Sequence, residues 1–181
     1  MAILIKIFIG LVVLVAALAV IGFFLPGNFK IERSIIIAAP AEKIYPMIAE
    51  TRNWRAWTMW NERDPNMKID YSGPASGVGA KWAWQSKSEG DGMMEFTAAD
   101  PLKGISYQLT FPEFGMNSGG VLSMTPEPAG TKMTWTNEGE FGANPFFHYF
   151  GLMMDRWVGK DFDAGLAKLK KVVEANAATA K

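Results

Sequence analysis

The side chains of this sequence best suited to binding chemistry are aromatic. Its 181 residues include seven Trp, twelve Phe and four Tyr, and every Trp follows position 50. Eight residues are our candidates for lining a ligand site: Trp57, Trp82, Trp84, Phe96, Tyr107, Trp135, Met154 and Trp157. Such side chains would enclose a largely apolar hollow with a few polar anchors, as small-molecule sites usually do. The alternative is that they pack a solid core, because Trp fills space without needing a ligand.

Carboxylates and hydroxyls are the remaining candidates for acid–base chemistry. Glu138 and Glu140 are two residues apart on a predicted strand, so they share one face, which we expect to be solvated. The aspartates of the C-terminal segment are likewise expected to be solvated charges. Arg52 and Arg156 could receive an anionic headgroup, although a surface role is the simpler interpretation. We assign no catalytic residue, and Tyr107 would be the first residue to test in an enzyme.

Composition argues against metal and nucleotide sites. The chain has no Cys and one His, whereas thiolate and multi-His metal sites need several, so we predict no metal. That residue, His148, is expected at a helix end or a pocket rim rather than in a Ser-His-Asp relay. Gly77-Val78-Gly79 is half of a dinucleotide fingerprint, but it enters a predicted strand instead of a helix. Because no P-loop is present either, no cofactor is predicted.

The charge balance argues against a nucleic-acid partner. Eighteen basic residues are matched by eighteen acidic ones, so no basic field exists to attract a phosphate backbone. No polybasic cluster follows the apolar N-terminal run, and specific capture of anionic lipid headgroups is therefore not expected.

The first residues form a long apolar run. From Ile3 to Leu25 the only charge is Lys6, and Pro26-Gly27 then cannot continue a helix. Because about 20 apolar residues cross a bilayer, we predict a single transmembrane anchor over residues 1–26 that holds the protein at the cell membrane. A cleaved signal peptide is the alternative, and a core helix would normally show a polar face. Basic residues lie on both sides of the span and leave the orientation of the domain open.

The rest of the chain is expected to form one domain over residues 27–176, followed by a frayed Ala-rich tail over 177–181. Pro40 is expected to open a helix over residues 40–48, in which Pro46 causes a kink or an early end. Trp54, Trp57 and Trp60 are spaced by three, which predicts a short helix or 3₁₀ turn. Alternating apolar and polar residues with Gly and Pro turns predict seven strands: 29–37, 67–72, 78–86, 93–98, 103–111, 119–125 and 131–141.

Consecutive alternating strands indicate an antiparallel sheet with one dry face, which needs a cover. Residues 146–175 have helical period and supply it with one apolar stripe: Phe150, Met154, Trp157, Val158, Phe162, Leu166, Leu169 and Val173. Gly151, Gly159 and Gly165 each cost this helix about 1 kcal/mol relative to Ala, which a bend or a close approach to the sheet would explain. The predicted fold class is α+β, a strongly bent sheet wrapped around one long helix.

Five segments, in this order, resemble the START-like or SRPBCC superfamily, also called the Bet v 1-like or polyketide cyclase/dehydrase and lipid-transport group. Residues 32–44 are similar to its first strand, Pro and helix start, and 52–57 to its Trp-x-x-Trp segment. Residues 72–80 are similar to its Gly-punctuated hairpin, 130–135 to its Gly-Thr-x-hydrophobic-Thr-Trp strand and 160–170 to its terminal helix. The resemblance implies a helix-grip fold, a seven-stranded curved antiparallel sheet around a long C-terminal helix. The anchor departs from the commonest members, which are soluble.

Members of this group bind or transform different apolar ligands, so the resemblance leaves three functions open. The first is a membrane-tethered domain that binds a hydrophobic small molecule or lipid. The second is a cyclase- or hydratase-like enzyme that uses a buried Asp, Glu or Tyr as its acid or base. The third is a ligand-free interaction or chaperone-like module.

Overall fold

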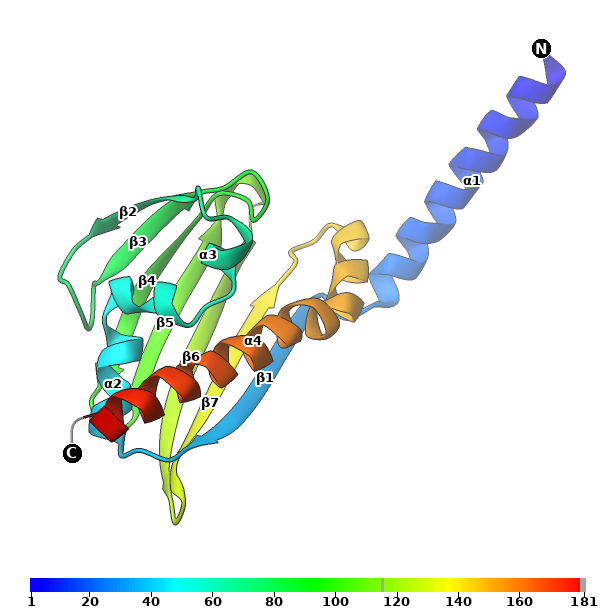
Figure 1. Cartoon of the computed structure of the whole chain (residues 1–181). Coiled ribbons are helices and arrows are strands. Elements are labelled where there is room, and N and C mark those ends of the chain that lie inside the picture. The colour runs from blue at the N-terminus through cyan, green and yellow to red at the C-terminus, as the bar shows by residue number, and fades with distance from the viewer. Residues whose placement is uncertain (115, 180–181) are drawn as a thin grey trace.

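The computed structural model describes residues 1–114 and 116–179, and it shows a helix followed by one α+β domain (Figure 1). Helix α1 (Ala2–Phe24) precedes strand β1 (Asn28–Ile37), helix α2 (Ala41–Ala49), the 3₁₀ helix η1 (Thr51–Ala56) and helix α3 (Trp60–Arg63). The remaining strands are β2 (Lys68–Ser72), β3 (Lys81–Gln85), β4 (Gly92–Asp100), β5 (Gly104–Phe111), β6 (Met116–Glu127) and β7 (Gly130–Glu140), with the 3₁₀ helix η2 (Pro112–Phe114) between β5 and β6. Helix α4 (Pro145–Thr179) ends the described chain, and residues 180–181 of the predicted tail lie outside it.

The seven strands form one antiparallel sheet in the order β1-β7-β6-β5-β4-β3-β2. Figure 1 shows the sheet curling around α4, with α2 at the end far from α1. A β-bulge between Phe96 and Ala98 in β4 adds to the bend, because the extra residue kinks its strand. The predicted helix-grip fold with seven curved strands is therefore confirmed.

Two predicted boundaries differ from the structure for local reasons. The strand predicted over residues 78–86 begins only at Lys81. Gly77 and Gly79 have φ of 77° and 82°, so they form a turn that donates backbone N–H groups to Ala49 and Phe96. Helix α2 is short, as expected from Pro46, and ends three residues after it.

The second half of α4 covers the sheet, with Phe162, Leu166, Leu169 and Val173 buried. The helix packs chiefly along β1, and Gly165 lets it approach closely, because a Cβ there would lie 3.2 Å from the Trp135 ring. A Cβ at Gly159 would overlap the Arg33 guanidinium, which is the end of a flexible side chain. The predicted close approach of the helix is confirmed at Gly165.

Arg33 of β1 fixes the middle of α4 with ion pairs. Its guanidinium donates to Asp155 at 2.8 Å and to Asp163 at 3.2 Å. The hydrogen bond from Arg33 lowers the pKa of the Asp155 carboxyl. Both aspartates remain exposed, so these contacts orient the helix more than they stabilise it.

The first half of α4 departs from the predicted buried stripe. Phe150 and Trp157 are each 48% exposed, whereas Met154 and Val158 of the same predicted stripe are half-buried against the core. There α4 is attached to α1 by side chains that reach backbone carbonyls: Tyr149 Oη donates to Leu18 O at 2.7 Å, and His148 Nδ1 lies 2.8 Å from Gly22 O. His148 therefore lies at a helix end, as expected.

Helix α1 is long and apolar enough to cross a membrane, and nearly all of its side chains are exposed. A buried core helix does not describe it, since only Gly22 is buried. Figure 1 shows it projecting away from the domain.

Candidate functional site

An apolar cavity of about 270 Å³ lies between the sheet and the middle of α4, where Met154, Val158, Asp161 and Phe162 line it. Its walls come from β1, η1, α3, the strands β2 to β7 and α4. Most of the lining side chains are aromatic or aliphatic: Phe29, Trp54, Trp60, Met67, Ile69, Tyr71, Trp82, Trp84, Met94, Tyr107, Leu109, Phe111, Met116, Met154, Val158 and Phe162. The volume is close to the lower end of the range of small-molecule sites.

Three aromatic side chains of the sheet face glycines on the neighbouring strand. The cross-strand pairs are Phe29 with Gly139, Trp84 with Gly92 and Tyr107 with Gly120. In each pair a Cβ built on the glycine would collide with the aromatic ring; at Gly139 it would lie 2.9 Å from the Phe29 ring. The ring therefore occupies the space that a side chain on the next strand would otherwise fill. All three of these aromatic residues line the cavity.

Tyr107 is the buried polar group of the cavity wall. Its hydroxyl oxygen accepts hydrogen bonds from Trp135 Nε1 at 2.9 Å and from Asn137 Nδ2 at 3.3 Å. Burial raises the pKa of Tyr107 to about 12, against the effect of these two hydrogen bonds. The hydroxyl is therefore protonated at neutral pH, and its own proton is available to an oxygen atom in the cavity.

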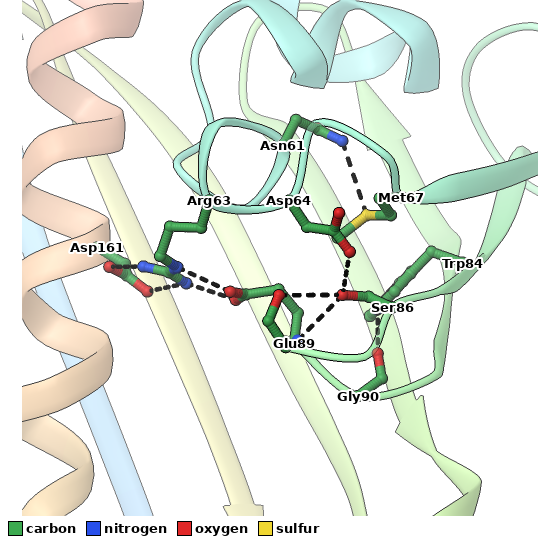
Figure 2. A network of polar contacts seen from close by, with 10 residues as sticks. Asn61, Arg63, Asp64, Met67, Trp84, Ser86, Glu89, Gly90 and Asp161 are labelled. Carbon is green, nitrogen blue, oxygen red and sulfur yellow. Dashed lines mark hydrogen bonds and ion pairs between the residues drawn. The ribbon is translucent and has the colours of Figure 1, made fainter.

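Part of the cavity wall is an ion-pair cluster centred on Arg63, whose contacts are shown in Figure 2. Its guanidinium donates to Glu89 at 2.9 and 2.6 Å and to Asp161 at 2.6 and 2.9 Å. These bonds raise the pKa of Arg63, the largest effect coming from Glu89. The cluster, which we call the Arg63 clasp, connects α3, the β3–β4 connection and α4, three elements that line the cavity.

Further hydrogen bonds hold the β3–β4 connection in place beside the clasp. Ser86 Oγ lies 2.6 Å from the Asp64 carboxylate, and Trp84 Nε1 donates to Gly90 O at 3.0 Å (Figure 2). The Asp91 carboxylate accepts the backbone N–H of Ser86 at 2.9 Å. Glu89 is therefore presented to Arg63 by a connection whose own polar groups are bonded.

The structure brings only part of the predicted site together. Trp82, Trp84, Tyr107 and Met154 line the cavity. The other four lie elsewhere: Trp57, Phe96 and Trp135 are buried in the core, and Trp157 is exposed on α4. Trp135, for example, stacks on Phe162 with ring centroids 3.8 Å apart. The aromatic set is thus divided between a core and a cavity, which the sequence had offered as alternatives.

Several lining residues were not among the predicted ones. Trp54 and Trp60 belong to the predicted Trp cluster, but the spacing of three did not show that they, rather than Trp57, line the cavity. Trp57 instead donates its indole N–H to Met47 O at 3.0 Å. The glycines opposite Trp84 and Tyr107 are a signal that could have been found once the strands were aligned.

The carboxylates that line the cavity are Glu89 and Asp161, and both are bonded to Arg63. Glu138 and Glu140 are exposed on β7. Among residues 1–114 and 116–179 no three His, Asp or Glu side chains gather as a metal site would require. The arrangement is therefore suited to binding an apolar molecule through its carbon surface, and Tyr107 contributes a buried hydroxyl to the wall.

Comparison with known proteins agrees with this geometry. Residues 28–174 match the family described as polyketide cyclase / dehydrase and lipid transport. No curated protein matches the chain significantly.

Solved structures show the same fold at low sequence identity. Protein MLL2253 from Mesorhizobium loti has a TM-score of 0.57 at 20% identity and covers 81% of this chain and 97% of its own. Protein SA2116 from Staphylococcus aureus has a TM-score of 0.62 at 11% identity, and the match covers 83% of this chain and 96% of that protein. Ara h 8.0201 has a TM-score of 0.55 at 12% identity, and the match covers 82% of this chain and 99% of that protein. Since the family match spans most of the sequence, this chain belongs to the polyketide cyclase / dehydrase and lipid transport family.

Proposed function

We propose that this protein is a membrane-tethered domain that binds a hydrophobic small molecule or a lipid in the cavity between its sheet and α4. The observation that carries this proposal is the cavity of about 270 Å³ with mainly aromatic and aliphatic walls. Burying ligand carbon there would supply about 25 cal/mol per Å² of apolar surface. Membership of a family described by lipid transport supports the same ligand class.

The buried polar groups favour an uncharged oxygen on the ligand. Tyr107, Asn137 and Ser118 line the cavity and carry no charge at neutral pH. A ligand hydroxyl or carbonyl oxygen can accept the proton of the Tyr107 hydroxyl. A carboxylate or ammonium in that position would lose its hydration without gaining an opposite charge.

Tethering is proposed through α1, with residues 1–26 as the anchor and residues 27–176 as the binding domain. The bonds from Tyr149 and His148 to α1 support retention of the helix, because cleavage in the segment 17–19 would remove Leu18 or leave an apolar terminus. A helix that is apolar on every side and exposed in water is also unfavourable, and a bilayer removes that cost.

Native mass spectrometry of the full chain, released gently from detergent, tests the proposal. We expect a non-covalently bound hydrophobic molecule to co-purify with the protein. The variant Trp84→Ala should lose this molecule at a smaller cost in stability than a core variant, because Trp84 is a half-buried lining residue. Trp135→Ala is the matched core variant, and it should chiefly reduce stability, by about 3–5 kcal/mol. A protein that stays empty, both as purified and after incubation with decanol, would refute ligand binding.

A further inference from the structure

The beginning of α4 exposes more apolar surface than a soluble domain normally shows. Phe146, Phe150, Met153 and Trp157 are between 41% and 48% exposed, and Leu152 is 63% exposed. The first four follow the spacing i, i+4, i+7 and i+11, so they form one stripe along the helix. A contiguous exposed apolar surface of this kind marks an interaction site. We call residues 146–157 the interfacial segment.

The interfacial segment lies beside the end of α1. Tyr149 bonds to Leu18 O, and a Cβ at Gly22 would collide with the Pro145 backbone. Leu18 is six residues before the end of α1 at Phe24, which corresponds to about 9 Å along the helix axis. Figure 1 shows the first turns of α4 next to the last turns of α1.

We propose that the interfacial segment is a second membrane contact, which lies in the interfacial region of the bilayer that α1 enters. This inference depends on the proposed role of α1 as an anchor. If the last turns of α1 lie in lipid, the turns of α4 that are bonded to them lie at the same depth. The lipid bilayer is thus the partner that covers the exposed stripe.

The residues around the stripe fit the boundary between lipid and water. Trp is favoured at this boundary because its ring is apolar and its N–H is polar. Arg156 and Lys160 are exposed, and within the described part of the chain neither takes part in an ion pair. Long cationic side chains at such positions extend toward lipid phosphates while their methylene groups lie on apolar surface.

The same turns of α4 also form part of the cavity wall, through Met154 and Val158. The lipid surface therefore lies within about one helical turn of the cavity. A hydrophobic ligand then passes between bilayer and cavity without crossing bulk water, which gives a reason for joining a lipid-binding fold to an anchor.

Spin labelling of the full chain in phosphatidylcholine vesicles tests this proposal. The chain has no Cys, so each introduced one is a unique attachment site for a nitroxide. The variants are Phe150→Cys in the interfacial segment, Leu14→Cys in α1 and Val78→Cys as the matched control. All three positions are exposed, between 48% and 60%. Val78 lies in the connection between β2 and β3, in which Ser76 pairs with Glu50 at the end of α2. The rates at which each label collides with oxygen and with a water-soluble nickel chelate are then measured. Frequent collision with oxygen indicates that the label is in lipid, and frequent collision with the chelate indicates that it is in water.

We expect oxygen to collide more often than the chelate at Phe150 and Leu14, and less often at Val78. If Leu14 reports lipid but Phe150 reports water, the second membrane contact is refuted and the anchor stands. If Leu14 also reports water, the anchor itself fails, and the inference fails with it. Phe146→Cys repeats the measurement at a second exposed position, so that one badly folded variant does not decide the outcome.

Discussion

Gly120 tests how the sheet leaves room for a ligand. It lies opposite Tyr107 on the dry face, and the Cβ of Gly120→Ala would overlap the tyrosine ring and hydroxyl. Gly119, the preceding residue of β6, is its matched control. It faces the other side of the sheet, and a Cβ at this position would have no atom within 4 Å. The two substitutions therefore add the same methyl group to the same strand on opposite faces.

The cost of Gly120→Ala follows from the contacts that the ring must give up. Overpacking of a core costs about 1–3 kcal/mol, and moving the ring leaves two buried donors, on Trp135 and Asn137, without their acceptor. We expect a loss of about 2–5 kcal/mol in the free energy of unfolding. Gly119→Ala should be neutral or stabilising by up to about 1 kcal/mol, since it only restricts the unfolded chain.

Ligand binding should change in parallel. A displaced ring that takes the space of two ligand methylenes removes about 1.6 kcal/mol of binding free energy, which is roughly a tenfold weaker affinity. The assays are urea unfolding of the full chain in detergent, followed by Trp fluorescence, and native mass spectrometry during titration with decanol. Gly119→Ala should retain the wild-type affinity.

A double-mutant cycle shows whether the cost of Gly120→Ala comes from the Tyr107 ring or from some other contact of the added methyl group. Tyr107→Leu removes the ring, so Gly120→Ala should cost much less in that background than in the wild type. Two results would show that the position of the Tyr107 ring does not depend on Gly120. One is an equal loss of unfolding free energy from Gly120→Ala in both backgrounds, and the other is an equal effect of Gly120→Ala and Gly119→Ala.

Three further predictions concern the buried hydroxyl, the clasp and the junction with α1. Because the pKa of Tyr107 is raised to about 12 from 10, the unfolded chain loses this proton first as the pH rises. The free energy of unfolding should therefore fall by about 2.7 kcal/mol in all from well below pH 10 to well above pH 12, and Tyr107→Phe should abolish this decrease in alkaline unfolding titrations. Arg63→Met leaves Glu89 and Asp161 without their cation and should cost about 1–3 kcal/mol of stability. It should also speed the exchange of bound decanol, measured by stopped-flow displacement, and an exchange rate equal to that of the wild type would refute the clasp. Tyr149→Phe removes the hydrogen bond to Leu18 O and should increase amide hydrogen exchange in the first turns of α4. Unchanged protection of these amides would contradict the proposed junction between α1 and α4.

Local patterns were sufficient to predict the architecture. Alternation in segments such as Ile105 to Phe111 identifies a strand with one dry face, and this pattern depends only on neighbouring residues. The positive φ values of Gly77 and Gly79 shortened a predicted strand, because a turn can interrupt an otherwise apolar run. The stripe on α4 was correct where the sheet covers it and wrong at Phe150 and Trp157. An apolar stripe shows that a surface avoids water, but it does not distinguish protein from lipid.

The cavity depended on contacts that sequence spacing does not reveal. Trp135 and Trp84 both alternate with polar residues on strands, yet one is core and the other lines the cavity. The difference comes from cross-strand register and from the glycine opposite Trp84. The Arg63 clasp was missed because its partners are 26 and 98 residues away, beyond any local pattern.

Photolabelling of the wild-type chain in vesicles would test the central claim most directly. A medium-chain alcohol that carries a diazirine is equilibrated with the full chain, activated by light and located by peptide mass spectrometry. We predict label on cavity residues, such as Met94 of β4, which lines the cavity and is only 1% exposed. Excess decanol should compete this label away while labelling of α1 from the lipid persists. Label confined to α1 and to exposed residues, with none on the cavity walls, would contradict the claim that this domain encloses a hydrophobic guest.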